Sequence, residues 1–231
     1  MSTALTNCDL NSLGGSNYKV ALVAYQIEQG TAVGLRAKDG VVLATDKRMA
    51  YGSFVMSRNA KKVFLLNNRV GIAMSGLYAD VGAIVRFLSA ESKYYELTSE
   101  RPMSLYSIAK LLSSILYSYK VLPFLIEAVV GGIDRDGQPK VFTLDSLGSV
   151  SEDKYMAVGS GATTALGLLE SQYRDDVSLA EAEELAVSAL RVSMERDAST
   201  GDGIDVLSIS VAGEVKEKSL RLRVVENRGS P

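Results

Sequence analysis

Hydrophobic residues along the chain follow two different spacings. Short runs rich in Val, Ile and Leu are typical of β-strands, whereas apolar residues at i, i+3, i+4 and i+7 form one face of a helix. The strand spacing occurs over residues 31–37, 41–45, 63–66, 70–74, 126–133, 141–144, 204–211 and 215–224. Turn-forming residues separate several of these runs, as at Asp39-Gly40, Asn67-Asn68 and 134–137. The pattern therefore predicts strands joined in hairpins.

The helical spacing also recurs along the chain. It predicts one helix whose apolar face is Val81, Ile84, Val85 and Leu88, and a second whose face is Leu105, Ile108, Leu112 and Ile115. The second helix ends before Pro123, since proline cannot continue it. Two further helices are predicted over about 162–171 and 179–196. The last of these begins with Ser178 and Glu181 at the spacing of a capping box, in which each side chain bonds the other residue's backbone amide.

The predicted order is ββ-ββ-αα-ββ-αα-ββ, which indicates an α+β fold. Strands do not alternate singly with helices, so a parallel Rossmann sheet is disfavoured. Hairpins imply antiparallel sheets, and the paired helices need apolar faces to cover. Two sheets packed face to face, with a helix layer outside each, bury every apolar face. We therefore expect a single domain with a four-layer αββα sandwich.

The amino-terminal segment differs from this domain. Residues 1–17 are polar and rich in Gly, Ser and Asn, which is typical of a flexible leader, and a short apolar run follows over Val20–Tyr25. The segment has neither the basic start nor the compact apolar stretch of a secretory signal. No apolar run approaches the roughly 18 residues of a membrane helix. We therefore expect a cytoplasmic protein with no membrane association.

Composition narrows the possible chemistry. Lys plus Arg number 25 against 27 for Asp plus Glu, so no excess charge attracts nucleic acid. The chain has no histidine, which excludes a Ser-His-Asp triad, a Cys-His pair and an HExxH zinc helix. The single cysteine, Cys8, excludes a disulfide framework and a CxxC metal site. We expect no metal and no cofactor, and any covalent catalysis must use Lys, a carboxylate or a terminal amine as base.

Several short motifs allow both a functional and a structural interpretation. The segment Gly159–Thr164 lacks the third glycine of GxGxxG and the Lys of a P-loop, so a tight strand-to-helix turn is favoured over nucleotide binding. Lys61-Lys62 and Asp46-Lys47-Arg48 are consistent with solvated strand edges, but a lysine beside a carboxylate can also adjoin a nucleophile. Thr31 is an ordinary strand residue unless the peptide bond after Gly30 is cut. A free terminal amine has a pKa near 8 and could then accept the hydroxyl proton.

Together these residues resemble a known family, the proteasome β subunits, which are N-terminal nucleophile hydrolases. The resemblance spans residues 30 to 211. It rests on the opening run Gly30–Arg48 and on the segments 59–63, 74–80, 131–134, 159–161, 169–173, 195–197, Gly201 and 204–205. It implies the same αββα sandwich, preceded by a leader or propeptide over residues 1–30 and spanning residues 31–231.

The resemblance also implies an activity, which is peptide-bond hydrolysis by an amino-terminal threonine after autocatalytic cleavage at Gly30. Thr31 would be the nucleophile once the peptide bond after Gly30 is cut. By position, Asp46 would orient Lys62, which activates the hydroxyl. The backbone N–H of Gly76 would form the oxyanion hole. Three further residues would hold the terminus: Ser160, Asp197 and Thr200. Ala60 and Met74 would line an apolar specificity pocket.

The resemblance implies partners as well. These are proteasome α subunits and other β subunits in stacked heptameric rings, a regulatory ATPase acting on the assembled particle, and unfolded polypeptides as substrates. Alternatives from other classes are a gate-forming α-type subunit and a nucleotide-binding enzyme. The first is disfavoured because residues 1–17 show no helical period.

One departure from the family leaves two interpretations open. The family's nucleophile lies sixteen residues before the acidic residue and thirty-two before the lysine, and both counts lead from Asp46 and Lys62 to Gly30. Thr31 therefore occupies the second position. A one-residue slip moves a strand side chain by about 3.3 Å and to the other face. Either cleavage after Gly30 lets Thr31 shift into place, or the chain is a noncatalytic β subunit that completes a ring in which another β subunit holds the nucleophile.

Overall fold

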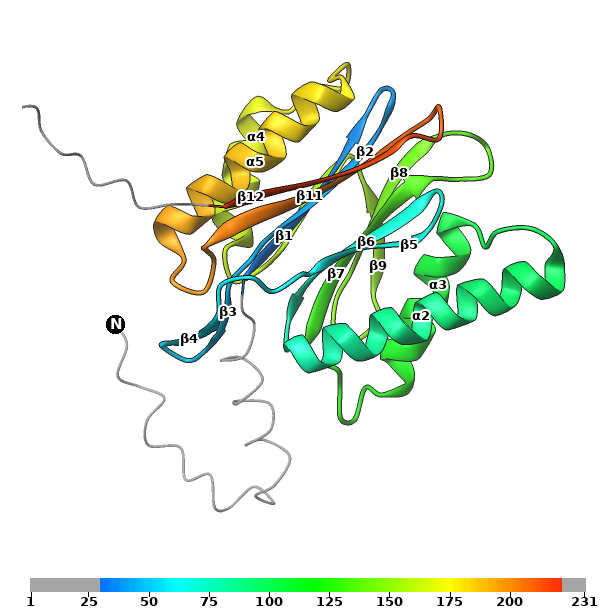
Figure 1. Ribbon diagram of the computed structural model, residues 1–231, viewed down its shortest axis with the longest axis horizontal. Coiled ribbons are helices and arrows are strands. Elements are labelled where there is room, and N and C mark those ends of the chain that lie inside the picture. The colour runs from blue at the N-terminus through cyan, green and yellow to red at the C-terminus, as the bar shows by residue number, and fades with distance from the viewer. Residues whose placement is uncertain (1–29, 222–231) are drawn as a thin grey trace, which may run out of the picture.

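A computed structural model describes residues 30–221. It contains two five-stranded antiparallel sheets and a separate two-stranded hairpin (Figure 1). The first sheet has the order β10-β1-β2-β11-β12, and the second has the order β5-β6-β7-β8-β9. The expectations for residues 1–29, including the leader, Cys8 and the run Val20–Tyr25, lie outside the described residues, as do positions 222–224 of the last predicted strand.

The strands of the first sheet are β1 (Thr31–Ala37), β2 (Gly40–Asp46), β10 (Tyr155–Gly159), β11 (Gly203–Ser210) and β12 (Val215–Arg221). Those of the second are β5 (Val63–Asn67), β6 (Val70–Gly76), β7 (Ile126–Ile133), β8 (Pro139–Leu144) and β9 (Val150–Asp153). The hairpin consists of β3 (Met49–Tyr51) and β4 (Phe54–Ser57). The helices are α2 (Tyr78–Ser99), α3 (Leu105–Ser118), α4 (Ala162–Gln172) and α5 (Leu179–Arg196).

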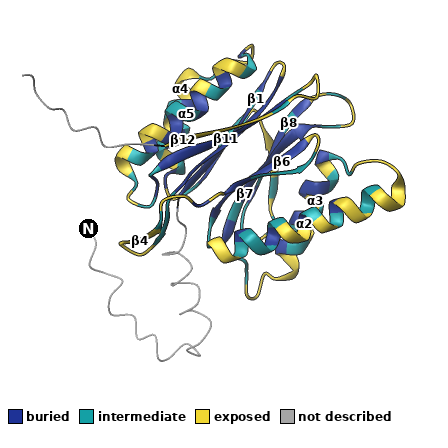
Figure 2. Cartoon of the chain, viewed as in Figure 1, coloured by how far each residue is buried: buried dark blue, intermediate teal, exposed yellow. Residues whose placement is uncertain are grey.

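Three apolar clusters hold four layers together. One joins the first sheet to α4 and α5, a second joins the other sheet to α2 and α3, and a third lies between the two sheets. Figure 2 shows the sheets as the most buried part of the described chain, with exposed residues on the outer helix faces. The structure therefore confirms the αββα sandwich. The capping box of α5 is also present, with Ser178 and Glu181 bonding each other's backbone amides.

Four strands lie outside the predicted strand ranges: β3, β4, β9 and β10. For β10, only the strand-to-helix turn after Gly159 was expected. β9 has the sequence Val-Ser-Glu-Asp and is mostly exposed, so it has no apolar period to detect. β3 and β4 have three and four residues. β10 has five residues, and its antiparallel pairing with β1 places Gly159 opposite Thr31. This pairing is the long-range contact that assembles the candidate site.

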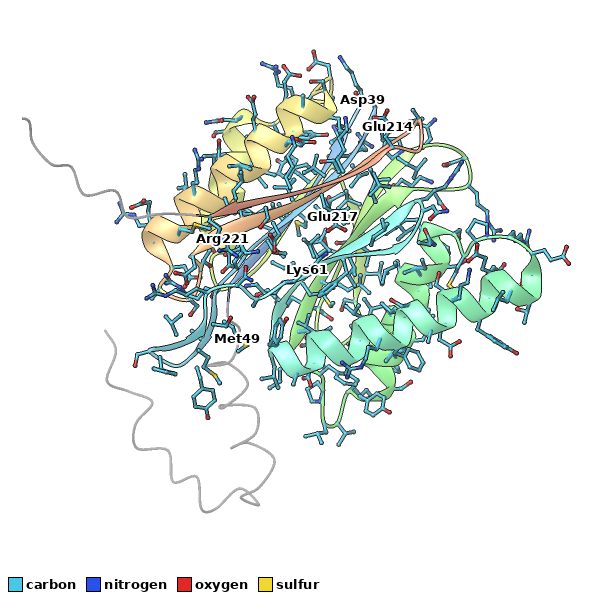
Figure 3. All side chains as sticks on the ribbon, in the orientation of Figure 1. Asp39, Met49, Lys61, Glu214, Glu217 and Arg221 are labelled. Carbon is cyan, nitrogen blue, oxygen red and sulfur yellow. The ribbon has the colours of Figure 1, made fainter. Side chains whose placement is uncertain are left out.

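The open side of the sandwich carries charged residues. Lys61, just before β5, forms an ion pair with Glu217 of β12, with 2.8 Å between Nζ and Oε2 (Figure 3). Charged side chains on an edge strand oppose unwanted pairing with another sheet. No helix among residues 30–221 is both long enough and apolar enough to cross a membrane.

Candidate active site

The start of β1 places Gly30 and Thr31 on opposite faces of the first sheet. Ala32 packs in the cluster between the sheets, whereas Val33 and Leu35 pack against α4 and α5. Side chains alternate along a strand, so Thr31 shares the face of Val33. Its hydroxyl is 2.7 Å from Thr200 Oγ1, and the residue has no exposed surface. The Thr31 side chain therefore points into the helix side of the sheet.

Asp46 is the centre of the polar network at this sheet end. Its Oδ1 accepts from the Thr31 backbone N–H at 2.9 Å and from Lys62 Nζ at 2.5 Å. Its Oδ2 accepts from the backbone N–H groups of Arg48 and Gly201, at 2.9 and 3.0 Å. The carboxylate is fully buried, and these four donors, one of them cationic, offset the cost of removing it from water. Asp46 is thus held rigidly between the β1 start and Lys62.

The Lys62 ammonium faces Gly30 rather than Thr31. Lys62 is 2% exposed, and its Nζ also donates to the Arg48 carbonyl at 3.1 Å. A Cβ on Gly30 would lie 2.5 Å from Asp46 Oδ1 and closer still to Lys62 Nζ. Gly30 also has φ of +93°, a conformation that glycine adopts without strain. The position opposite the lysine and carboxylate therefore has no side chain and no room for one in this arrangement.

A second network approaches from the α5 end. Asp197 Oδ2 accepts from Ser160 Oγ at 2.6 Å and from Thr200 Oγ1 at 2.5 Å. Ser160 in turn accepts from the Gly30 N–H at 3.2 Å. Thr200 links this network to the Thr31 hydroxyl. The structure thus brings Thr31, Asp46, Lys62, Ser160, Asp197 and Thr200 together around Gly30.

Two residues near the site were missing from the sequence analysis. Ser75 Oγ donates to the Gly30 carbonyl at 3.0 Å, and Ser160 Oγ lies 3.3 Å from the same oxygen. Glu127, opposite Ser75 in the β6–β7 register, accepts from the Gly159 N–H at 2.7 Å. Alternation from Ala73, which faces the other sheet, would have placed Ser75 on the inner face. Nothing local marks Glu127, because its partner Gly159 comes from another sheet.

The remaining predicted residues lie around the second sheet. Gly76 ends β6 with φ of +120° and shares a pocket of about 300 Å³ with Lys62. That pocket is otherwise lined by Arg48, by residues of the β3–β4 hairpin and by the start of α2. Ala60, two residues before Lys62, is buried, as is Met74. Neither residue lines this pocket. Met74 packs instead in the cluster with α2 and α3.

Arg48 closes the polar end of this region. Its Nε donates to Asp202 Oδ2 at 2.7 Å, and a second guanidinium nitrogen donates to the Ala198 carbonyl at 2.7 Å. The hydrogen bond to Asp202 raises the pKa of Arg48 further, so the guanidinium stays charged. Among residues 30–221 no cluster of three or more His, Cys, Asp or Glu side chains could hold a metal ion.

Comparisons with known proteins show the family of this chain. A family model described as "Proteasome subunit" matches residues 27–209. "Proteasome subunit beta 1" of Ignicoccus hospitalis is 50% identical over 192 residues, which are 83% of this chain and 96% of the relative. The beta 1 subunit of Desulfurococcus amylolyticus is 51% identical over 80% of this chain and 91% of its own length. "Proteasome subunit beta 2" of Caldivirga maquilingensis is 45% identical over 85% and 98%. The chain therefore belongs to the proteasome subunit family and is similar to its archaeal β subunits.

Proposed function

We propose that this chain is a structural β subunit of a proteasome core particle, and that another β subunit supplies the nucleophile. The observation that carries the proposal is the absence of a side chain at Gly30, the residue that faces Lys62 Nζ and Asp46 Oδ1. A hydroxyl nucleophile must lie within hydrogen-bonding reach of its base. Here that place is taken by glycine.

The position of Thr31 supports the same conclusion. Its hydroxyl points toward Thr200 on the helix side and is fully buried, so a polypeptide in the pocket beside Lys62 cannot reach it. Moving it to the other face requires a shift of one strand residue, about 3.3 Å. Catalysis depends on placement finer than that. Asp46 and Lys62 then serve to bind an uncut peptide rather than to activate a terminal threonine.

The particle itself would carry out the family's activity. We infer that it degrades cytoplasmic proteins by threonine-type peptide-bond hydrolysis, with α subunits and other β subunits in stacked heptameric rings. Unfolded polypeptides would be its substrates, delivered by a regulatory ATPase. In that assembly this chain contributes a wall of the chamber.

A second candidate function has one specific observation in its favour. The Thr31 backbone nitrogen is already 2.9 Å from Asp46 Oδ1. Cleavage after Gly30 would turn this nitrogen into a terminal amine, whose ordinary pKa near 8 leaves part of it neutral and able to accept a proton. Thr31 would then be the nucleophile after its strand end shifts by one residue, with Gly76 as oxyanion donor.

Particles assembled from this chain, an α subunit and a second β subunit separate the two candidates. We expect intact-mass analysis to show residues up to Gly30 still attached. We also expect Thr31→Val, which keeps the side-chain shape without the hydroxyl, to leave peptide hydrolysis unchanged. Replacing the terminal threonine of the second β subunit by alanine is the positive control and should abolish hydrolysis. A chain that begins at Thr31, together with activity lost in Thr31→Val, would refute the structural role.

A further inference from the structure

Hydrogen bonds hold the peptide unit between Gly30 and Thr31 on both sides. The Thr31 N–H donates to Asp46, and the Gly30 carbonyl accepts from Ser75. Ser160 lies within hydrogen-bonding distance of both the N–H and the carbonyl of Gly30. These partners match an uncut amide, which offers one donor and one acceptor. The point at which the leader joins the domain is therefore fixed in space.

An apolar pocket begins next to this fixed point. Lys62, whose Nζ lies against Gly30, forms part of the wall of the 300 Å³ pocket. Away from Lys62 the wall is formed by Met49, Tyr51 and Met56 of the hairpin and by Leu77 and Tyr78 at the start of α2. Figure 1 shows this hairpin projecting at the same end of the molecule as the first turn of α2, and Met49 lies where it leaves the first sheet (Figure 3).

Apolar side chains of the β3–β4 hairpin beside the pocket are exposed to water. Tyr51 is 69% exposed, and Phe54 and Met56 are similarly open. Contiguous apolar patches on a soluble chain mark sites that another segment or partner covers. The pocket volume suits one or two apolar side chains rather than a folded partner.

The leader supplies a segment of this kind at the right distance. The chain preceding Gly30 has 29 residues, and its apolar run Val20–Tyr25 is separated from Gly30 by only four residues. Four extended residues span roughly 13 Å. Because the pocket opens beside Lys62, and Lys62 contacts the position of Gly30, this spacer is long enough to bring the run into it. A tethered segment also binds at a high effective concentration, so no strong affinity is needed.

We propose that the segment Val20–Tyr25 of the retained leader docks in the pocket between the β3–β4 hairpin and α2. The inference rests on the proposed function, because the leader must remain attached. It goes beyond that function because it gives the leader a binding site on its own subunit, in the pocket between the hairpin and α2.

Engineered cysteines in the full-length chain test the docking. In a Cys8→Ser background, we expect Leu22→Cys with Met56→Cys to form an intrachain disulfide at least tenfold faster than the control pair Leu5→Cys with Met56→Cys. Equal rates for the two pairs would overturn the proposal. A disulfide between two copies of the chain would also overturn it, because a second copy would then occupy the pocket.

A second measurement does not depend on cysteine geometry. Leu22→Asp should release the segment and raise the fluorescence of the apolar dye ANS several-fold, whereas Leu5→Asp should leave it unchanged. Equal dye binding by wild type and Leu22→Asp would overturn the docking. Intact mass and the Thr31→Val particle together distinguish the two proposals. A cut leader defeats the docking, and it defeats the structural role as well when Thr31→Val also loses activity. A retained leader without the disulfide defeats only the docking.

Discussion

The strongest stability prediction concerns Gly30→Ala. The added methyl group would lie 2.5 Å from Asp46 Oδ1 and overlap Lys62 Nζ, in a residue whose φ is +93°. The left-handed conformation alone costs a non-glycine residue about 1–2 kcal/mol. If the ammonium must leave the carboxylate, the broken buried ion pair adds about 3–5 kcal/mol. The sum, roughly 4–7 kcal/mol, is a large part of a domain's total stability.

Gly137→Ala is the matched control for this prediction. Gly137 has a similar φ of +79° in the turn between β7 and β8, but no atom lies within 4 Å of a Cβ added there. The control should therefore show only the conformational cost. Each kcal/mol lowers the melting temperature of a domain of this size by about 2–4 °C. We expect a fall of several degrees for Gly137→Ala and of about 10 °C or more for Gly30→Ala.

Calorimetry of the two variants, under the same conditions as the wild type, measures the difference. A Gly30→Ala chain that melts together with Gly137→Ala would refute the reasoning, because Lys62 would then be free to move without cost. The result would also weaken the structural role, since a threonine at position 30 could then be accommodated. Urea unfolding provides an independent value of the free-energy difference.

Three further predictions concern other parts of the fold. Asp205→Asn should lower the free energy of unfolding, measured in urea, by about 3–5 kcal/mol. The reason is that the buried ammonium of Lys47, which lies 2.7 Å from Asp205 Oδ1, loses its carboxylate partner. Lys47→Met combined with Asp205→Leu should recover most of this loss. The hydrogen bond to Glu170 raises the pKa of Tyr155 to about 12, so the folded chain keeps a proton that the unfolded chain loses near pH 10. This stabilisation is complete below pH 10 and is lost toward pH 12. The difference in melting temperature between wild type and Tyr155→Phe should therefore narrow over that range. A constant difference would contradict the raised pKa of Tyr155. Ser178→Ala removes the N-cap of α5 and should cost about 1 kcal/mol by urea unfolding, whereas an unchanged midpoint would show that the cap contributes nothing.

Local patterns were sufficient for most of the architecture. The hairpins and helices of the sandwich follow from periods of 2 and 3.6 residues, and an apolar face must be covered wherever it occurs. The spacing of Asp46 and Lys62 along the chain was likewise sufficient to place Gly30 at the nucleophile position.

Other features depended on contacts between distant segments. β9 is held by its pairing with β8, and its mostly polar residues carry little strand signal. The partner of β10 is β1, which is far away in the sequence. Ser75 and Glu127 reach the site only because β6 and β7 approach the end of β1 across the sandwich. The predicted pocket residues Ala60 and Met74 are apolar and buried, but only the packing shows that Met74 joins the cluster with α2 and α3.

The sequence by itself determined the family, the four-layer fold and the glycine at the critical position, because these depend on spacing along the chain. Only the tertiary structure decided which way each side chain points at the start of β1. It places the Lys62 ammonium against Gly30 and the Thr31 hydroxyl against Thr200, on opposite faces of one strand. Alternation along the strand makes these faces exclusive, so the same two residues cannot exchange roles without moving the backbone.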